Sequence, residues 1–129
     1  MRVLYICTGN SYRSPLAEAL TRKYRLVLEV ESAGIHPVSE VAEITESQLR
    51  NRDAVQYVKP RPDNVSQRAI DEADKVMCMM HKHSEYIKRN FEIDPGKIKV
   101  WHVEDPIHPD ISPEKAFEEI EEEVRNIDG

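Results

Sequence analysis

Four short, mainly apolar runs are spaced along the chain, and segments with helical patterning lie between them. The runs are Val3 to Ile6, Leu26 to Val30, Val76 to Met80 and Ile98 to Val103. Continuous apolar runs of this kind are typical of strands that are covered on both faces. Strands that alternate with helices form right-handed βαβ units. The sequence therefore predicts an α/β domain with a parallel sheet, and no linker or internal repeat divides residues 1–129.

Helix signals fill the intervals between these runs. Ser14-Pro15 offers an N-cap and a first-turn proline, and the segment 41–58 has weaker helical periodicity. The remaining expected helices run from a Ser66 cap through Ala73, around Tyr86 to Phe91, and from Ser112-Pro113 with an apolar stripe of Phe117, Ile120, Val124 and Ile127. The acidic run 118–123 is interpreted as the solvated face of the last helix.

Composition and charge narrow the classes of function. The net charge of −6 and pI near 5.4 argue against a nucleic-acid partner, because proteins that bind nucleic acids usually carry a basic surface. No apolar run approaches the roughly 20 residues of a membrane span, and the N-terminus lacks the pattern of a signal peptide. Two cysteines, Cys7 and Cys78, are too few for a secreted disulfide scaffold. We therefore expect a cytoplasmic protein that binds neither nucleic acid nor membranes.

The segment that follows the first run is the most informative part of the chain. It reads Cys7-Thr8-Gly9-Asn10-Ser11-Tyr12-Arg13-Ser14-Pro15 and lies between a predicted strand and a predicted helix. Backbone N–H groups in such a loop can point into one concavity and bind an anion, aided by the helix N-terminus. Gly9 and Asn10 tolerate the positive φ angles of a tight loop. The sequence predicts a phosphate-binding loop formed by Thr8, Gly9, Asn10, Ser11, Tyr12 and Ser14.

Two side chains in this loop have the chemistry of a covalent phosphatase. Cys7 begins the loop, where N–H groups and a cation favour a nucleophilic thiolate. Arg13 closes it, and its planar guanidinium can hold two phosphate oxygens. Ser14 can donate a hydrogen bond to the sulfur. The alternative is a buried structural cysteine beside an exposed arginine, but the preceding strand, the Gly-Asn pair and the Ser-Pro pair favour catalysis.

The segment Cys7 to Pro15 resembles the active-site signature of low-molecular-weight protein tyrosine phosphatases. Further resemblances follow in family order: Leu16-Ala17-Glu18-Ala19, Glu31-Ser32-Ala33-Gly34, Ala73-Asp74 and Asp105-Pro106. The resemblance implies a single three-layer domain with a four-stranded parallel sheet flanked by helices on both faces. It also implies hydrolysis of phosphotyrosine through a phosphocysteine intermediate, without a metal or cofactor. The partners would be a phosphotyrosine-containing protein or small aryl phosphate, and phosphate itself.

The same resemblance assigns a general acid/base to Asp105. One carboxyl group can protonate the leaving oxygen and later activate water, and Glu104 and Asp110 are nearby competitors. The sequence also departs from the family pattern. Tyr12 replaces a frequent cysteine, Ile107 and His108 replace aromatic residues that line the cleft, and no histidine near Lys59-Pro60-Arg61 is placed to brace the phosphate loop.

Three other interpretations remain open. Thioredoxin-coupled arsenate reductases share this fold and often read Cys-Thr-Gly-Asn-Ser, but they need two further cysteines, and only Cys78 is present. Cys78 is expected to be a buried, inert thiol. A phosphate-binding module without catalysis is the second alternative. The third is a metal site, but the five histidines lack the ligand spacing that metal sites show, and His81 and His83 are expected at the surface.

Overall fold

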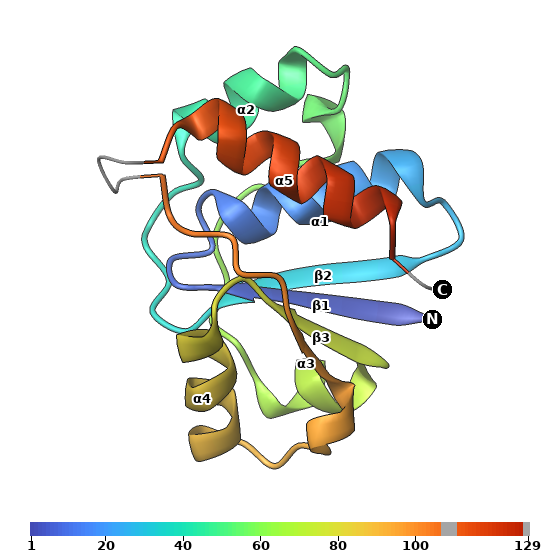
Figure 1. The fold of residues 1–129 in the computed structure, drawn as a ribbon, viewed down its shortest axis with the longest axis vertical. Coiled ribbons are helices and arrows are strands. Elements are labelled where there is room, and N and C mark those ends of the chain that lie inside the picture. The colour runs from blue at the N-terminus through green and yellow to red at the C-terminus, as the bar shows by residue number, and fades with distance from the viewer. Residues whose placement is uncertain (107–110, 128–129) are drawn as a thin grey trace.

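The four predicted strands form one parallel sheet at the centre of the molecule (Figure 1). The computed structural model describes residues 1–106 and 111–127. The sheet has the order β2-β1-β3-β4. The strands are β1 (Arg2–Cys7), β2 (Glu29–Gly34), β3 (Lys75–Cys78) and β4 (Ile98–Val100), and all three pairings are parallel. The carboxyl ends of β1 and its neighbours therefore meet at one edge.

Helices cover both faces of the sheet, as expected. The helices α1 (Arg13–Tyr24), α2 (Glu43–Arg50) and α5 (Pro113–Arg125) lie on one side, and α3 (Gln67–Glu72) and α4 (His81–Asn90) lie on the other (Figure 1). Short 3₁₀ helices η1 (Val55–Tyr57) and η2 (Pro95–Lys97) complete the described elements. None of the described helices has the length and apolar character of a membrane span.

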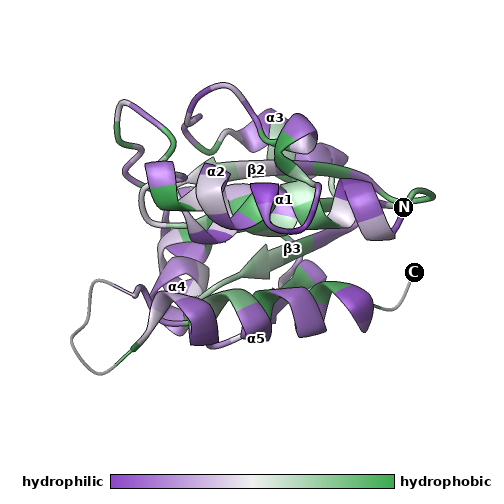
Figure 2. Cartoon of the chain, turned by 90° about the horizontal axis from the view of Figure 1, so that it is seen from above, coloured by the Kyte–Doolittle hydropathy of each residue, from purple (hydrophilic) through white to green (hydrophobic). Residues whose placement is uncertain are grey.

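Two apolar cores follow from the alternation of side chains along β1. Val3, Tyr5 and Cys7 belong to the core under α1 and α5, whereas Leu4 and Ile6 belong to the core under α3 and α4. The expected stripe of α5 is buried, and α5 packs on α1: the stripe consists of Phe117, Ile120, Val124 and, just beyond the helix, Ile127. Figure 2 shows apolar and hydrophilic segments alternating along α5. The three-layer prediction is confirmed.

The predicted start of the second strand is wrong. β2 begins at Glu29, and Leu26 and Val27 lie before it with 81% of their surface exposed. Pairing decides the boundary, because Arg2 lies opposite Glu29 and Cys7 lies opposite Gly34. This register extends β2 through the Ser-Ala-Gly segment to the edge where the Cys7 loop begins.

Other element boundaries also differ from the predicted ones. β3 ends at Cys78 and β4 at Val100, and the segment 41–58 divides into α2 and η1, with Asp53 between them at φ 54°. Ser66 caps its helix as predicted, by accepting a hydrogen bond from Ala69 N. The last helix starts at Ser112-Pro113 as predicted, and Ser112 caps it by accepting a hydrogen bond from Lys115 N.

The predicted N-cap at Ser14 is wrong. The first helix begins at Arg13, its N-cap is Tyr12, and no side chain caps it. Ser14 therefore lies within the first turn, where its hydroxyl contacts the sulfur of Cys7.

Candidate active site

A cavity of about 310 Å³ lies at the carboxyl edge of the sheet. The Cys7 loop lines it with Cys7, Thr8, Gly9, Ser11, Tyr12 and Arg13. The segment after β2 contributes His36, Val38, Ala42 and Ile44, and the segment after β4 contributes Asp105 and Pro106. Three chain segments that follow three different strands therefore converge on this cavity, where ligands bind in parallel sheets.

The structure brings the predicted nucleophile and the predicted clamp together. Cys7 ends β1 and Arg13 begins α1, and both are almost fully buried. The Nη1 of Arg13 donates to the carbonyl of Val103 at 3.0 Å, which ties the guanidinium to the segment after β4. The oxygen of Ser14 lies 2.9 Å from the sulfur of Cys7. When the sulfur is a thiolate, Ser14 must be the donor of this hydrogen bond.

Asp105 lies at the same cavity. One of its carboxylate oxygens is 3.9 Å from Nη2 of Arg13, and 42% of its side chain is exposed. Glu104 is exposed and lines a different cavity with Met80 and His102. Asp110, Ile107 and His108 lie outside the described residues. Of the two candidate acids that the structure describes, only Asp105 lies beside Arg13.

The hydroxyl of Tyr12 is bonded to neighbouring helices. Tyr12 is among the residues that line the cavity, and its hydroxyl donates to Oε1 of Gln48 at 2.6 Å and lies 3.1 Å from the carbonyl of Pro113. Burial raises the pKa of Tyr12 to about 12. Tyr12 therefore links the loop to α2 and α5 as a neutral hydrogen-bonding group.

Asn10 faces away from the cavity and holds the loop from behind. Its φ is 51°, in the left-handed region, and its side chain is completely buried. Its amide nitrogen donates to Ser14 Oγ at 2.8 Å and to Ser32 Oγ at 3.0 Å. Its amide oxygen accepts hydrogen bonds from Lys59 Nζ at 2.6 Å and from the backbone N–H of Asp63 at 2.8 Å. The left-handed backbone conformation of Asn10 costs free energy, and these four hydrogen bonds stabilise it.

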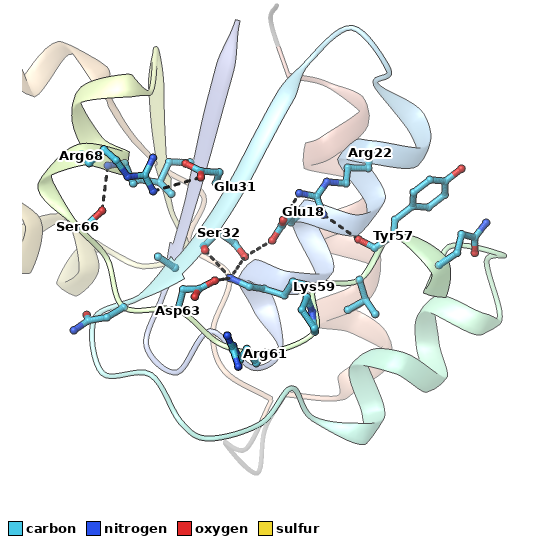
Figure 3. A pocket seen from close by; sticks show the side chains of 17 residues that line it. Glu18, Arg22, Glu31, Ser32, Tyr57, Lys59, Arg61, Asp63, Ser66 and Arg68 are labelled. Atoms are coloured by element: carbon cyan, nitrogen blue, oxygen red, sulfur yellow. Dashed lines mark hydrogen bonds and ion pairs between the residues drawn. The ribbon is translucent and has the colours of Figure 1, made fainter.

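Lys59 takes the place of the missing histidine brace. Besides Asn10, its buried ammonium donates to the carbonyl of Ser32 at 2.8 Å and pairs with Asp63 at 2.9 Å (Figure 3). Behind it, Ser32 donates to Glu18 at 2.5 Å, and Glu18 pairs with Arg22 at 2.7 Å. Burial raises the pKa of Glu18, and the bond from Ser32 and the cations of Arg22 and Lys59 oppose this shift. A charged network thus supports the loop from a segment far away in sequence.

Replacing Lys59 by methionine should loosen the phosphate loop. The ammonium makes short hydrogen bonds to Asn10 and Ser32, and methionine leaves both oxygens buried without that donor. We expect the free energy of unfolding to fall by about 2–3 kcal/mol and turnover of an aryl phosphate to fall about tenfold or more, because Asn10 is no longer held. Denaturant melts and steady-state kinetics measure both effects.

Arg61→Met is the matched control, because Arg61 is an exposed cation in the same segment. Equal losses in the two variants would contradict a bracing role for Lys59 and indicate a general effect of charge on this surface.

His83 is a site residue that sequence reasoning missed. It is completely buried near the N-terminus of α4, so the predicted surface position is wrong. Its Nε2 lies 2.9 Å from the hydroxyl oxygen of Thr8, and its Nδ1 accepts the backbone N–H of Met80 at 3.0 Å. One feature of the sequence could have indicated its burial. His83 lies three residues after Met80, the position from which a side chain commonly bonds back to the backbone N–H of the N-cap residue.

Cys7 and Cys78 are free thiols in separate cores. Cys7 belongs to the core under α1 and α5, and Cys78 belongs to the core under α3 and α4. Burial raises the pKa of Cys78 to about 12. The expected burial of Cys78 is confirmed, and the raised pKa of its thiol is consistent with low reactivity. Within residues 1–106 and 111–127, no group of three or more His, Cys, Asp or Glu side chains is arranged to hold a metal ion.

Comparison with known proteins agrees with this geometry. The family model described as low molecular weight phosphotyrosine protein phosphatase matches residues 2–128. The chain is 31% identical over 96 residues to the low molecular weight protein-tyrosine-phosphatase PtpB of Staphylococcus aureus, an alignment that covers 70% of this chain and 65% of that protein. It is 30% identical over 91 residues to a protein-arginine-phosphatase of Geobacillus stearothermophilus, covering 70% of this chain and 62% of that protein. The matched stretch is thus less than two thirds of either relative's length.

Solved structures show the same fold. A YwlE mutant from Bacillus subtilis superposes with a TM-score of 0.84 at 24% identity, covering 97% of this chain and 94% of that one. Wzb of Vibrio vulnificus in complex with benzylphosphonate also gives a TM-score of 0.84, at 19% identity, covering 96% of this chain and 94% of that one. The family match over nearly the whole chain, together with the Cys7 loop, shows that this protein belongs to the low molecular weight phosphotyrosine protein phosphatase family.

Proposed function

We propose that this protein hydrolyses phosphotyrosine and related aryl phosphate monoesters through a phosphocysteine intermediate on Cys7. The observation that carries the proposal is the convergence of Cys7, Arg13 and Asp105 on one cavity. A phosphate-binding module without catalysis needs neither a nucleophile nor an acid there. The substrate would be a phosphotyrosine-containing protein or a small aryl phosphate. We place the enzyme in the cytoplasm, because Cys7 and Cys78 are both free thiols and are too few for a secreted disulfide scaffold.

The mechanism has two steps, and Asp105 acts as the acid in the first and as the base in the second. The Cys7 thiolate attacks phosphorus, the P–S bond forms, and the ester P–O bond breaks as Asp105 protonates the leaving phenolate. Asp105 then takes a proton from water, which attacks phosphorus and expels the thiolate. The Ser14 hydroxyl stabilises that thiolate as it leaves. Throughout, Arg13 and the loop N–H groups hold the nonbridging oxygens.

Phosphoarginine is a second candidate substrate. A relative with 30% identity is named a protein-arginine-phosphatase, and the half-exposed Asp105 carboxylate at the cavity can pair with a guanidinium group. Measuring kcat/KM for matched peptides that carry phosphotyrosine or phosphoarginine tests the assignment. Preference for phosphotyrosine supports the proposal, preference for phosphoarginine supports the second candidate, and no turnover of either peptide or of para-nitrophenyl phosphate would refute a phosphatase.

Asp105→Asn should slow phosphotyrosine hydrolysis by about 100-fold, the lower range for loss of a general acid. The deficit should shrink for esters with good leaving groups, which depart without a proton. Kinetics across a series of substituted phenyl phosphates measure this trend. Glu104→Gln is the matched control, because Glu104 neighbours Asp105 but lines another cavity. Equal deficits for all leaving groups in Asp105→Asn would mean that Asp105 positions substrate instead.

Cys78→Ala should leave aryl phosphatase activity nearly unchanged, and the wild type should show negligible thioredoxin-dependent arsenate reduction. A reductase must pass a disulfide from Cys7 to a second thiol with close sulfur–sulfur contact. Cys78 lies in the opposite core, and its raised pKa makes a thiolate rare. Parallel assays with para-nitrophenyl phosphate and arsenate measure both activities. Robust arsenate turnover that disappears in Cys78→Ala would replace the phosphatase proposal with a reductase.

A further inference from the structure

The orientation of the His83 ring follows from its two hydrogen bonds. Nδ1 accepts the backbone N–H of Met80 at 3.0 Å, so Nδ1 carries no proton. Burial, followed by the cations of Arg13 and Lys82, lowers the pKa of His83 to about 3. The neutral ring therefore carries its proton on Nε2, and Nε2–H donates to the hydroxyl oxygen of Thr8 at 2.9 Å.

The hydroxyl oxygen of Thr8 accepts from two sides. Besides His83, Nη2 of Arg13 donates to it at 3.4 Å. A threonine hydroxyl has two lone pairs and one hydrogen, so these two hydrogen bonds occupy both of its lone pairs. No acceptor for its hydrogen is found among residues 1–106 and 111–127. Thr8 is half-buried and lines the cavity beside Cys7 and Arg13, so this hydrogen is left to face the cavity.

We propose that the Thr8 hydroxyl is a further hydrogen-bond donor to the phosphoryl oxygens, and that His83 is the positioning residue that directs it there. The proposal rests on the proposed function, because it concerns the same oxyanion site. His83 fixes the direction of its bond to Thr8: Nδ1 accepts the N–H of Met80, so Nε2 carries the ring proton and can only donate to Thr8. The Thr8 hydroxyl cannot turn its own hydrogen toward His83, so it donates to the ligand.

Binding of inorganic phosphate to the resting enzyme tests this without any turnover. Thr8→Val removes the hydroxyl at similar volume and should weaken phosphate binding about tenfold or more, the usual effect of losing a hydrogen bond to a charged group. Thr8→Ser should bind nearly as the wild type does. Thr21→Val is the control, because it removes another buried threonine hydroxyl, bonded to Tyr5 and Ala17, away from the cavity.

The effects of His83 and Thr8 variants on phosphate affinity, measured singly and together, separate a positioning role for His83 from a structural one. His83→Gln keeps a residue type that caps helices at this position but loses the fixed ring, and it should weaken phosphate binding severalfold. In the Thr8→Val background the same change should add little, because its effect passes through Thr8. A nitrogen–proton NMR correlation should find the ring proton on Nε2 at neutral pH.

Each outcome decides the proposal. Wild-type phosphate affinity in folded Thr8→Val, additive losses in the double variant, or a ring proton on Nδ1 would overturn it. Where Thr8→Val does not fold, Thr8→Ala provides the same comparison. The proposed function can fail independently of this proposal. If the protein bound phosphate through Thr8 but hydrolysed no phosphoester, the phosphatase assignment would be refuted and the role of Thr8 as a donor would be retained.

Discussion

Cys7→Ser is expected to abolish turnover of aryl phosphates while the protein still folds and binds phosphate. The sulfur lies at the end of β1, 2.9 Å from the Ser14 hydroxyl, and a serine oxygen there is a poor nucleophile without a base beside it. Loss of a covalent nucleophile lowers kcat by roughly 10⁴- to 10⁶-fold. Phosphate binding should persist because Arg13 and the loop N–H groups remain.

Three measurements check this expectation: steady-state hydrolysis of para-nitrophenyl phosphate, calorimetric titration with phosphate, and a thermal melt. Cys78→Ala serves as the control for loss of a buried thiol. Substantial hydrolysis by Cys7→Ser would exclude the phosphocysteine mechanism and point to direct attack by water.

Arg13→Lys should lower turnover by about 10³-fold, the upper range for loss of a transition-state donor, and should weaken phosphate binding. The guanidinium donates to Val103 and to Thr8 while facing the cavity, and it does so from a buried position. A lysine ammonium is a single donor centre and cannot hold Val103 and two phosphate oxygens in one plane. Both kcat/KM and inhibition by phosphate report the change.

Arg50→Lys on the exposed face of α2 is the matched control, since it makes the same chemical change at a surface ion pair with Glu46. Full activity in Arg13→Lys would mean that charge alone suffices in the oxyanion site and that the planar fork has no role.

Local sequence signals predicted the features that depend on neighbours in the chain. The loop after β1 was predicted because glycine, asparagine, cysteine and arginine follow one another at fixed spacing between a strand and a helix. The cap at Ser66 and the helix start at Ser112-Pro113 were predicted because a capping side chain bonds a backbone N–H only three residues away. Where a tertiary contact competed, local reasoning failed: Ser14 contacts the sulfur of Cys7 instead of capping its helix.

Pairing between strands overrode local hydrophobicity in β2. Leu26 and Val27 are apolar but exposed, and the strand begins at Glu29 because β1 pairs from there. Strand register is a property of two segments, and an apolar run in one of them does not contain it. Cys78 is a similar case. Its burial was predicted from its apolar neighbours, but its place in the other core from Cys7 depends on how side chains alternate along two paired strands.

The sequence by itself was enough to predict the α/β architecture and to propose Cys7 as the nucleophile and Arg13 as the clamp, because these depend on residue type, spacing and strand–helix alternation along the chain. The proposal of Asp105 as the acid came from the resemblance to a family. Only the tertiary structure decided what holds these groups. Lys59 reaches Asn10 across 49 residues, and His83 reaches Thr8 across 75. Such partners are chosen by where the folded backbone leaves a buried donor or acceptor unsatisfied. That need arises after folding brings the segments together, and no local pattern in the chain records it.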